Sequence, residues 1–219
     1  MAKRNNFSDF FDIFLNLIFP PKCVICKKIG DVLCENCFSK IKHFPQQKIN
    51  PPKNINLMVV CGYYDGILKK LIRKFKFSKK KSLSSYLVRF VEECIKDKNY
   101  FYSADIITSV PLHQTRLKER GFNQSELIAK QLSNFLNLPY DGNILKRIKE
   151  TSFMYNLSKS ERKKNVKGVF SVSRNLNGLN ILIIDDILTT GATLSEIASE
   201  IKKNGANSVY ALVVAKSVM

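Results

Sequence analysis

The stretch from Asn180 to Thr193 constrains the fold more than any other part of the sequence. It opens with an uncharged apolar run, Asn180–Ile184, followed directly by two carboxylates, Asp185 and Asp186. A hydroxyl-rich loop with one glycine then leads into an amphipathic helix over 194–203. A strand buried on both faces and followed by a loop and a helix is typical of an open parallel α/β sheet. Ligands of such sheets bind beyond the carboxyl ends of the strands, where the two aspartates stand.

Other apolar segments alternate in type along the chain and extend this pattern. Strands are expected over 57–64, 104–110, 143–148, 169–172 and 208–215, and helices over 69–81, 84–98 and 123–136. The sequence therefore predicts an α/β fold, with a mostly parallel sheet flanked by helices and a small module in front of it.

Four of the six cysteines form two closely spaced pairs, Cys23-x2-Cys26 and Cys34-x2-Cys37. Two such pairs supply four thiolates that can reach one tetrahedral ion, and zinc is the ion that suits them. A shell of four cysteines has no open position for a substrate, so we expect a structural zinc site. A redox pair or two disulfides would need a thioredoxin-like context or export.

The segment over 41–56, rich in Pro, Asn and Gln, resembles a linker and predicts two domains, over 1–50 and 57–219. The apolar stretch over 7–19 contains Asp9 and Asp12 and is followed by two prolines. It therefore predicts a docked helix rather than an export signal or a spanning helix. A helix lying on a membrane surface remains an alternative. We expect a cytoplasmic protein, at most peripheral to the inner membrane.

Positive charge is in large excess, because 36 Lys and Arg face 18 Asp and Glu for a formal net charge of +18. Eight of these cations lie between Lys69 and Lys81 without an acidic residue among them. Phenylalanines are interleaved with them, as in surfaces that bind single-stranded nucleic acid by charge and stacking. The predicted nucleic-acid-binding residues are Lys69, Lys70, Arg73, Lys74, Phe75, Lys76, Phe77, Lys79, Lys80 and Lys81.

The loop after the two aspartates has the residues of a phosphate site. Backbone N–H groups at a helix start bind phosphate, a glycine lets the backbone approach, and hydroxyls add donors. The carboxylates suit vicinal ribose hydroxyls or a divalent cation. The whole run resembles the phosphoribosyl pyrophosphate (PRPP) loop of type I phosphoribosyltransferases. This resemblance assigns Asp185 and Asp186 to the ribose hydroxyls and Thr189, Thr190, Gly191, Ala192 and Thr193 to the 5-phosphate, with Mg²⁺ accompanying PRPP.

A second block is similar to the signature of the ComF (ComFC) competence protein family. It contains Val110-Pro111-Leu112-His113, Arg116 and Arg120-Gly121-Phe122-Asn123-Gln124. Because this segment follows a strand at the same sheet edge, Arg116 and Arg120 are predicted to meet anionic oxygens of PRPP. The resemblance implies handling of incoming single-stranded DNA during natural transformation, with a DNA-translocating ATPase and the inner-membrane DNA channel as partners.

The sequence leaves more than one function open. The chain is predicted to be a ComF-like protein that binds single-stranded DNA and PRPP. The alternative is an active phosphoribosyltransferase that joins a base or amine to PRPP and releases pyrophosphate. A third possibility is a zinc-based adaptor that does not bind PRPP. No acceptor-binding segment is recognisable, so catalytic residues remain unassigned and enzymatic activity is undecided.

Overall fold

The computed structural model describes residues 19–46, 49–78, 80–96, 100–150 and 165–217. The chain divides into two compact units, Met1–Ile41 and Lys42–Met219, which are described separately below. The predicted domains over 1–50 and 57–219 stay a prediction. All but the last residue of the predicted helix over 7–19 lies outside the described residues.

The first unit contains one short helix, α2 (Glu35–Phe38), within its described part. Lys22 and Ile29 form an isolated antiparallel bridge that closes the turn carrying the first cysteine pair. Cys34 precedes α2 as its N-cap residue, and Cys37 lies buried within the helix. The first cysteine pair therefore lies in the turn, and the second pair lies in α2 and at its N-cap.

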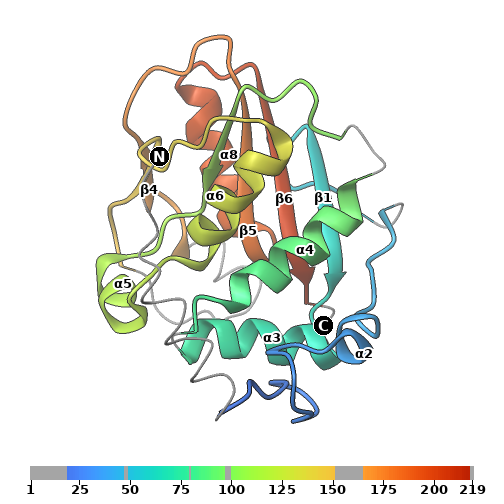
Figure 1. Cartoon of the computed structure of the whole chain (residues 1–219). Helices are drawn as coiled ribbons and strands as arrows, with labels where there is room; N and C mark the ends of the chain where they lie inside the picture. Colours follow the sequence, from blue (N-terminus) through green and yellow to red (C-terminus); the bar gives the residue numbers. More distant parts are fainter. Residues whose placement is uncertain (1–18, 47–48, 79, 97–99, 151–164, 218–219) are drawn as a thin grey trace, which may run out of the picture. The chain divides into compact units, whose positions relative to one another are not determined.

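The second unit is built on a four-stranded parallel sheet (Figure 1). Its strands are β1 (Leu57–Tyr63), β2 (Ile106–Ser109), β5 (Asn180–Leu188) and β6 (Ser208–Lys216). The order across the sheet is β1-β6-β5-β2, and each neighbouring pair is parallel. Strand β5 is thus internal, which explains its uninterrupted apolar run. This arrangement confirms the predicted α/β fold class.

One face of the sheet packs against α8 (Ala192–Lys203) and against an antiparallel hairpin. The hairpin strands are β3 (Leu145–Arg147) and β4 (Phe170–Val172). Ile181 and Ile183 of β5 share one apolar core with the buried side chains of α8 and the hairpin. Because strand side chains alternate between faces, Leu182 and Ile184 belong to the other face.

Three helices pack on that other face: α3 (Gly66–Phe77), α4 (Leu83–Ile95) and α6 (Gln124–Leu136). Each is amphipathic and turns its apolar stripe inward. In α3 the buried side chains are Leu68, Leu71, Ile72 and Phe75. Figure 1 shows α4 and α6 in front of the strands and α3 below them.

The helix predicted over 69–81 spans Gly66–Phe77, so Lys80 and Lys81 follow it. Two further differences from the sequence prediction bear on the site. Strand β5 continues to Leu188, so both aspartates lie inside the strand rather than after it. The extra residues pair with β6, for example Asp185 with Val213. In addition, α5 (Gln114–Arg120) follows β2 where no helix was predicted. This helix has no buried residue and therefore no apolar periodicity for a prediction to use.

The loop between β5 and α8 is held tightly against a distant proline. Gly191 adopts a left-handed conformation with φ of 76° and is the N-cap of α8. A Cβ atom placed on Gly191 would lie 2.6 Å from Cγ of Pro52. Both the backbone angle and the rigid proline ring therefore require glycine here.

We predict that Gly191→Ala lowers the free energy of unfolding by clearly more than Gly178→Ala. Gly178 has the same φ of 76°, but a Cβ there meets no atom within 4 Å. Gly178→Ala should cost about 1 to 2 kcal/mol for the left-handed angle alone. Gly191→Ala adds the contact with Pro52. Urea unfolding of both variants measures the difference, and equal losses would contradict the close approach of Pro52.

Candidate functional site

Two carboxylates stand in the last part of the central strand. Asp185 is half-buried, and Asp186 is only 8% exposed although it is charged. Buried carboxylates require partners, because a charge taken out of water is strongly destabilised. Two of their side-chain partners, Lys76 and Ser125, come from segments far away in the sequence.

Asp186 forms an ion pair with Lys76 of α3. The Lys76 Nζ atom lies 2.9 Å from Oδ1 and 2.8 Å from Oδ2, so the ammonium engages both carboxylate oxygens. The Lys76 side chain is 16% exposed, and that of Asp186 is 11% exposed. A residue predicted for nucleic-acid binding and a residue predicted for ribose binding are therefore in direct contact.

Further polar side chains act on Asp186 electrostatically. Arg120, at the end of α5, interacts favourably with Asp186, although burial lowers the pKa of this guanidinium. Burial and the negative charge of Asp186 raise the pKa of Tyr64, which follows β1, while Arg73 of α3 opposes that rise. Lys76 of α3, Arg120 of α5 and Tyr64 after β1 thus all interact with one carboxylate of β5.

Among the described residues, the hydrogen-bond partners of Asp185 are a hydroxyl and a backbone N–H. Its Oδ1 atom accepts a hydrogen bond from the hydroxyl of Ser125 at 3.3 Å and another from the backbone N–H of Asp186 at 2.9 Å. Burial, followed by the charge of Asp186, raises the pKa of Asp185 to about 7, and Lys76 only partly offsets this. Asp185 therefore exchanges a proton near neutral pH.

The predicted phosphate loop connects β5 to the first turn of α8. Thr189 is exposed, Thr190 and Thr193 are half-buried, and Gly191 is buried. The backbone N–H of Ala192 donates to Oγ1 of Thr190 at 3.4 Å. The next N–H groups of α8 have no carbonyl partner within the helix, so they can bind an anion.

The Arg120-to-Gln124 block turns out to be largely a connector. Gly121 ends α5 in a left-handed conformation, and Asn123 caps α6 by accepting from the N–H of Ser125. The Asn123 amide also donates to the carbonyl of Val110 at 2.9 Å, which ties α6 to the end of β2. Arg120 donates to Oε1 of Gln124 at 3.0 Å. The block therefore holds Arg120 and Ser125 beside the aspartates.

Arg116 lies in α5 and interacts electrostatically with Arg120 and with Arg147 of β3. His113 is the N-cap residue of α5, where its Nδ1 atom accepts from the N–H of Thr115 at 3.4 Å. Its Nδ1 also lies 3.8 Å from a carboxylate oxygen of Glu150. The binding of PRPP by Arg116 and Arg120 stays a prediction.

The basic segment of α3 divides into exposed and buried parts. Phe75 is fully buried and packs against Phe122, with ring centroids 5.3 Å apart. The prediction that Phe75 binds nucleic acid is therefore wrong, because its ring belongs to the core. Phe77 is 70% exposed, and the guanidinium carbon of Arg120 lies 5.5 Å from its ring centroid.

Among the described cations of this segment, all but one are exposed. Lys76 is the exception, since it is held by Asp186. The exposed cations are Lys69, Lys70, Arg73, Lys74, Lys80 and Lys81, while Lys79 lies outside the described residues. These exposed cations, four on α3 and two just after it, are called the α3 basic surface below.

The described residues also line a cavity of about 330 Å³ that does not include the aspartates. Its wall contains Ser109, Asn123, Lys130 and Tyr140. The Tyr140 hydroxyl is 3.1 Å from the hydroxyl of Ser109. This cavity lies beside β2. Lys76, Arg120 and Tyr64 interact instead with Asp186, which is not in its wall.

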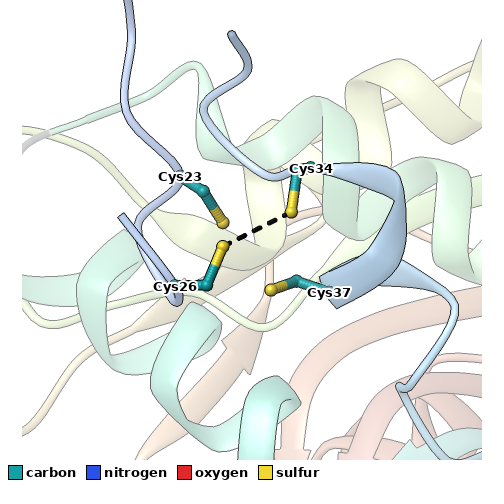
Figure 2. Close-up of side chains that lie close together, drawn as sticks. All are labelled: Cys23, Cys26, Cys34 and Cys37. Carbon is teal, nitrogen blue, oxygen red and sulfur yellow. Dashed lines mark hydrogen bonds between the residues drawn. The ribbon is translucent and has the colours of Figure 1, made fainter. Parts of the chain in front are cut away.

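The first unit contains a second candidate site. The Sγ atoms of Cys23, Cys26, Cys34 and Cys37 all lie within 4.8 Å of one another and point toward a common centre (Figure 2). Cys26 Sγ and Cys34 Sγ are 3.6 Å apart. With metal–sulfur bonds of about 2.3 Å, tetrahedral geometry places sulfur atoms about 3.8 Å apart. The four thiols therefore fit one metal ion.

The electrostatics of these thiols also fit a cation. Burial would raise the pKa of Cys23, but backbone N–H groups of the turn lower it to about 6. Burial, together with the neighbouring cysteines, raises the pKa of Cys37 to about 12. Four thiols at this distance resist joint ionisation unless a metal ion compensates their charge.

Comparison with known proteins decides the family. The chain is 31% identical over 193 residues to competence protein F of Haemophilus influenzae, covering 84% of each chain. It is 33% identical over 192 residues to the DNA utilization protein YhgH of Escherichia coli strain K12, covering 86% of this chain and 80% of the relative. The chain belongs to the ComF family.

Two further similarities agree with this membership. Competence protein ComFC of Bacillus subtilis is 29% identical over 165 residues, covering 70% of this chain and 62% of that protein. The phosphoribosyl transferase domain profile matches residues 121–217. That match spans β5, the loop and α8, so the parallel sheet is of the type I phosphoribosyltransferase kind.

Sequence reasoning missed three contributors to the site of this ComF-family chain. Tyr64 follows β1 at the carboxyl end of a parallel strand, and the same rule that located the aspartates also finds Tyr64. Ser125 and the partnership of Lys76 with Asp186 had no comparable signal.

Among the described residues, no helix combines the length and apolar character needed to cross a membrane.

We predict that Asp185→Asn gains stability relative to the wild type as the pH rises. The folded pKa of about 7 lies above the ordinary value of 3.8. Protonation of Asp185 therefore contributes its full stabilisation of the wild type below about pH 4, and this stabilisation is lost as the pH rises through 7. Asparagine keeps the acceptor oxygen without this titration. Urea unfolding in Mg²⁺-free buffer at pH 5 and pH 8 measures the difference. A gap independent of pH would contradict the raised pKa.

Proposed function

We propose that this ComF-family chain binds PRPP and single-stranded DNA and acts in DNA uptake during natural transformation. The names of its relatives, competence protein and DNA utilization protein, support a role in competence. The site itself supports the finer proposal on ligands, which the following paragraphs argue one ligand at a time.

The observation that carries the PRPP proposal is the sequence of groups from Asp185 to the first turn of α8. Two carboxylates accept hydrogen bonds from vicinal ribose hydroxyls, and the α8 N-terminus with its threonines binds the 5-phosphate. Arg120 lies close enough to act on Asp186, so it can pair with pyrophosphate oxygens. Mg²⁺ would neutralise part of the pyrophosphate charge when bound.

Single-stranded DNA is proposed to bind the α3 basic surface. Its cations are exposed and available for phosphate contacts. Phe77 provides an exposed flat ring for stacking on a base, and Arg120 already lies against that ring. Cations contact phosphates and an aromatic ring stacks on the face of a base, so neither depends on which base is present. These groups favour DNA binding that tolerates any base sequence.

An active phosphoribosyltransferase is the second candidate function. The match of residues 121–217 to the phosphoribosyl transferase domain favours it. In such a reaction, the bond from ribose C1 to pyrophosphate breaks and a bond from C1 to a base or amine forms. Arg120 and Mg²⁺ would stabilise the departing pyrophosphate. Release of pyrophosphate from PRPP with a panel of bases and amines separates the two functions.

The four-cysteine cluster is proposed to hold a structural zinc ion. Four thiolates fill a tetrahedral shell, so the ion would stabilise the first unit rather than react. A cytoplasmic location, a DNA-translocating ATPase and the inner-membrane channel as partners remain proposals that rest on the ComF resemblance alone.

We predict that Asp185→Asn combined with Asp186→Asn weakens PRPP binding at least about 100-fold. Each hydrogen bond from a hydroxyl to a charged carboxylate contributes about 1.5 kcal/mol or more, and tenfold corresponds to about 1.4 kcal/mol. Isothermal titration calorimetry with Mg²⁺ and PRPP gives the affinities. The matched control is Asp141→Asn, which removes a carboxylate paired with Arg174 outside the site. Equal affinity in wild type and double variant would refute the ribose assignment.

We predict one zinc ion per purified chain. Replacing Cys26 and Cys34 with serine should abolish zinc binding and lower the melting temperature, because metal binding is coupled to folding of such modules. Cys94→Ser, outside the cluster, should retain one zinc. Elemental analysis provides the metal content, and a folded wild-type protein free of zinc would contradict the proposal.

A further inference from the structure

The Lys76–Asp186 ion pair joins two surfaces that the proposed function treats as separate. Lys76 belongs to α3, whose other cations are part of the α3 basic surface. Asp186 belongs to β5 and to the proposed PRPP site. The ammonium lies 2.8 and 2.9 Å from the two carboxylate oxygens, so it engages both acceptors of Asp186.

The pair is shielded from solvent but does not lie in the apolar core. Its two side chains are 16% and 11% exposed, so the pair is not sealed from solvent. Arg120 interacts favourably with the same carboxylate. Asp186 therefore keeps a second cation nearby when Lys76 leaves, which lowers the penalty for exchanging one partner for another.

A ligand that uses Asp186 competes with Lys76. Ribose hydroxyls must donate to carboxylate oxygens that Lys76 occupies, and a divalent cation at Asp186 repels the ammonium directly. Within α3, position 76 lies one turn from the exposed Arg73, on the same side of the helix. A released Lys76 side chain therefore extends toward the α3 basic surface.

We propose that Lys76 couples the two ligands: PRPP displaces it from Asp186, and the freed ammonium becomes one more phosphate contact for single-stranded DNA. This inference rests on the proposed function, since it requires that both ligands bind. Each ligand then strengthens the binding of the other by the same factor, as thermodynamic linkage requires.

The size of the coupling follows from counterion release. Each additional contact with a single strand steepens the slope of log K against log salt by about 0.7. At a salt concentration of roughly 0.15 M, one contact raises affinity about fourfold relative to 1 M salt. We therefore expect saturating Mg²⁺–PRPP to tighten binding of an oligo-dT about fourfold and to steepen its salt slope by about 0.7.

Fluorescence anisotropy of labelled oligo-dT, with and without Mg²⁺–PRPP over a salt series, tests the coupling. Lys76→Gln should abolish the change that PRPP produces in affinity and slope. Lys74→Gln is the matched control: Lys74 is exposed on the same helix. It should reduce the slope in both states but keep the response to PRPP.

A second measurement covers the case in which Lys76→Gln fails to fold. Acetylation of the wild-type chain, read by mass spectrometry, should modify Lys76 faster when Mg²⁺–PRPP is present, while Lys74 reacts at an unchanged rate. PRPP-bound protein in which Lys76 stays protected would overturn the coupling.

The outcomes distinguish this inference from the proposed function. If wild-type protein binds neither PRPP nor DNA, the proposed function itself fails. If both bind but DNA affinity is the same or weaker with PRPP, only the coupling is overturned. A response to PRPP that persists in Lys76→Gln likewise overturns the role of Lys76.

Discussion

Strand β5 is paired on both edges, with β6 on one side and β2 on the other. Its parallel register continues through Asp185 and Ile187 to Leu188, so the aspartates cannot move independently of the sheet. Ser125 meets Asp185 because Asn123 fastens the start of α6 to the end of β2.

Because the strand is held on both edges, the Asp186 carboxylate has a fixed position, and cations of two helices interact with it. Lys76 contacts Asp186 directly, and Arg120 acts on the same carboxylate electrostatically. Burial and the charge of Asp186 raise the pKa of Asp185 to about 7, so Asp185 holds its proton to near neutral pH. A polar ligand that reaches this crevice therefore meets one carboxylate paired with Lys76 and another whose pKa lies near 7.

The predicted parts of the fold are those that depend on local sequence. Apolar runs located β5 and β6, because strands buried on both faces need uninterrupted hydrophobic residues. The four cysteines predicted their own cluster, since pairs separated by two residues place two thiols together. Phe75 was also predictable: it continues the spacing of Leu68, Leu71 and Ile72, which all lie in the core.

The missed parts depend on partners that are distant in sequence. The continuation of β5 to Leu188 comes from pairing with β6, which local hydrophobicity does not reveal. The contact between Lys76 and Asp186 joins residues 110 positions apart. Helix spacing shows that Lys76 lies beside a buried phenylalanine, but only the packing of α3 on the sheet shows which acid it meets.

A crystal structure of the chain with Mg²⁺ and PRPP tests the central claim most directly. The account predicts ribose hydroxyls within hydrogen-bonding distance of Asp185 and Asp186, the 5-phosphate at the start of α8, and Lys76 withdrawn from Asp186. A complex in which PRPP occupies the aspartates while Lys76 Nζ keeps its present 2.8 Å contact would contradict the exchange. PRPP bound elsewhere on the protein would contradict the site itself.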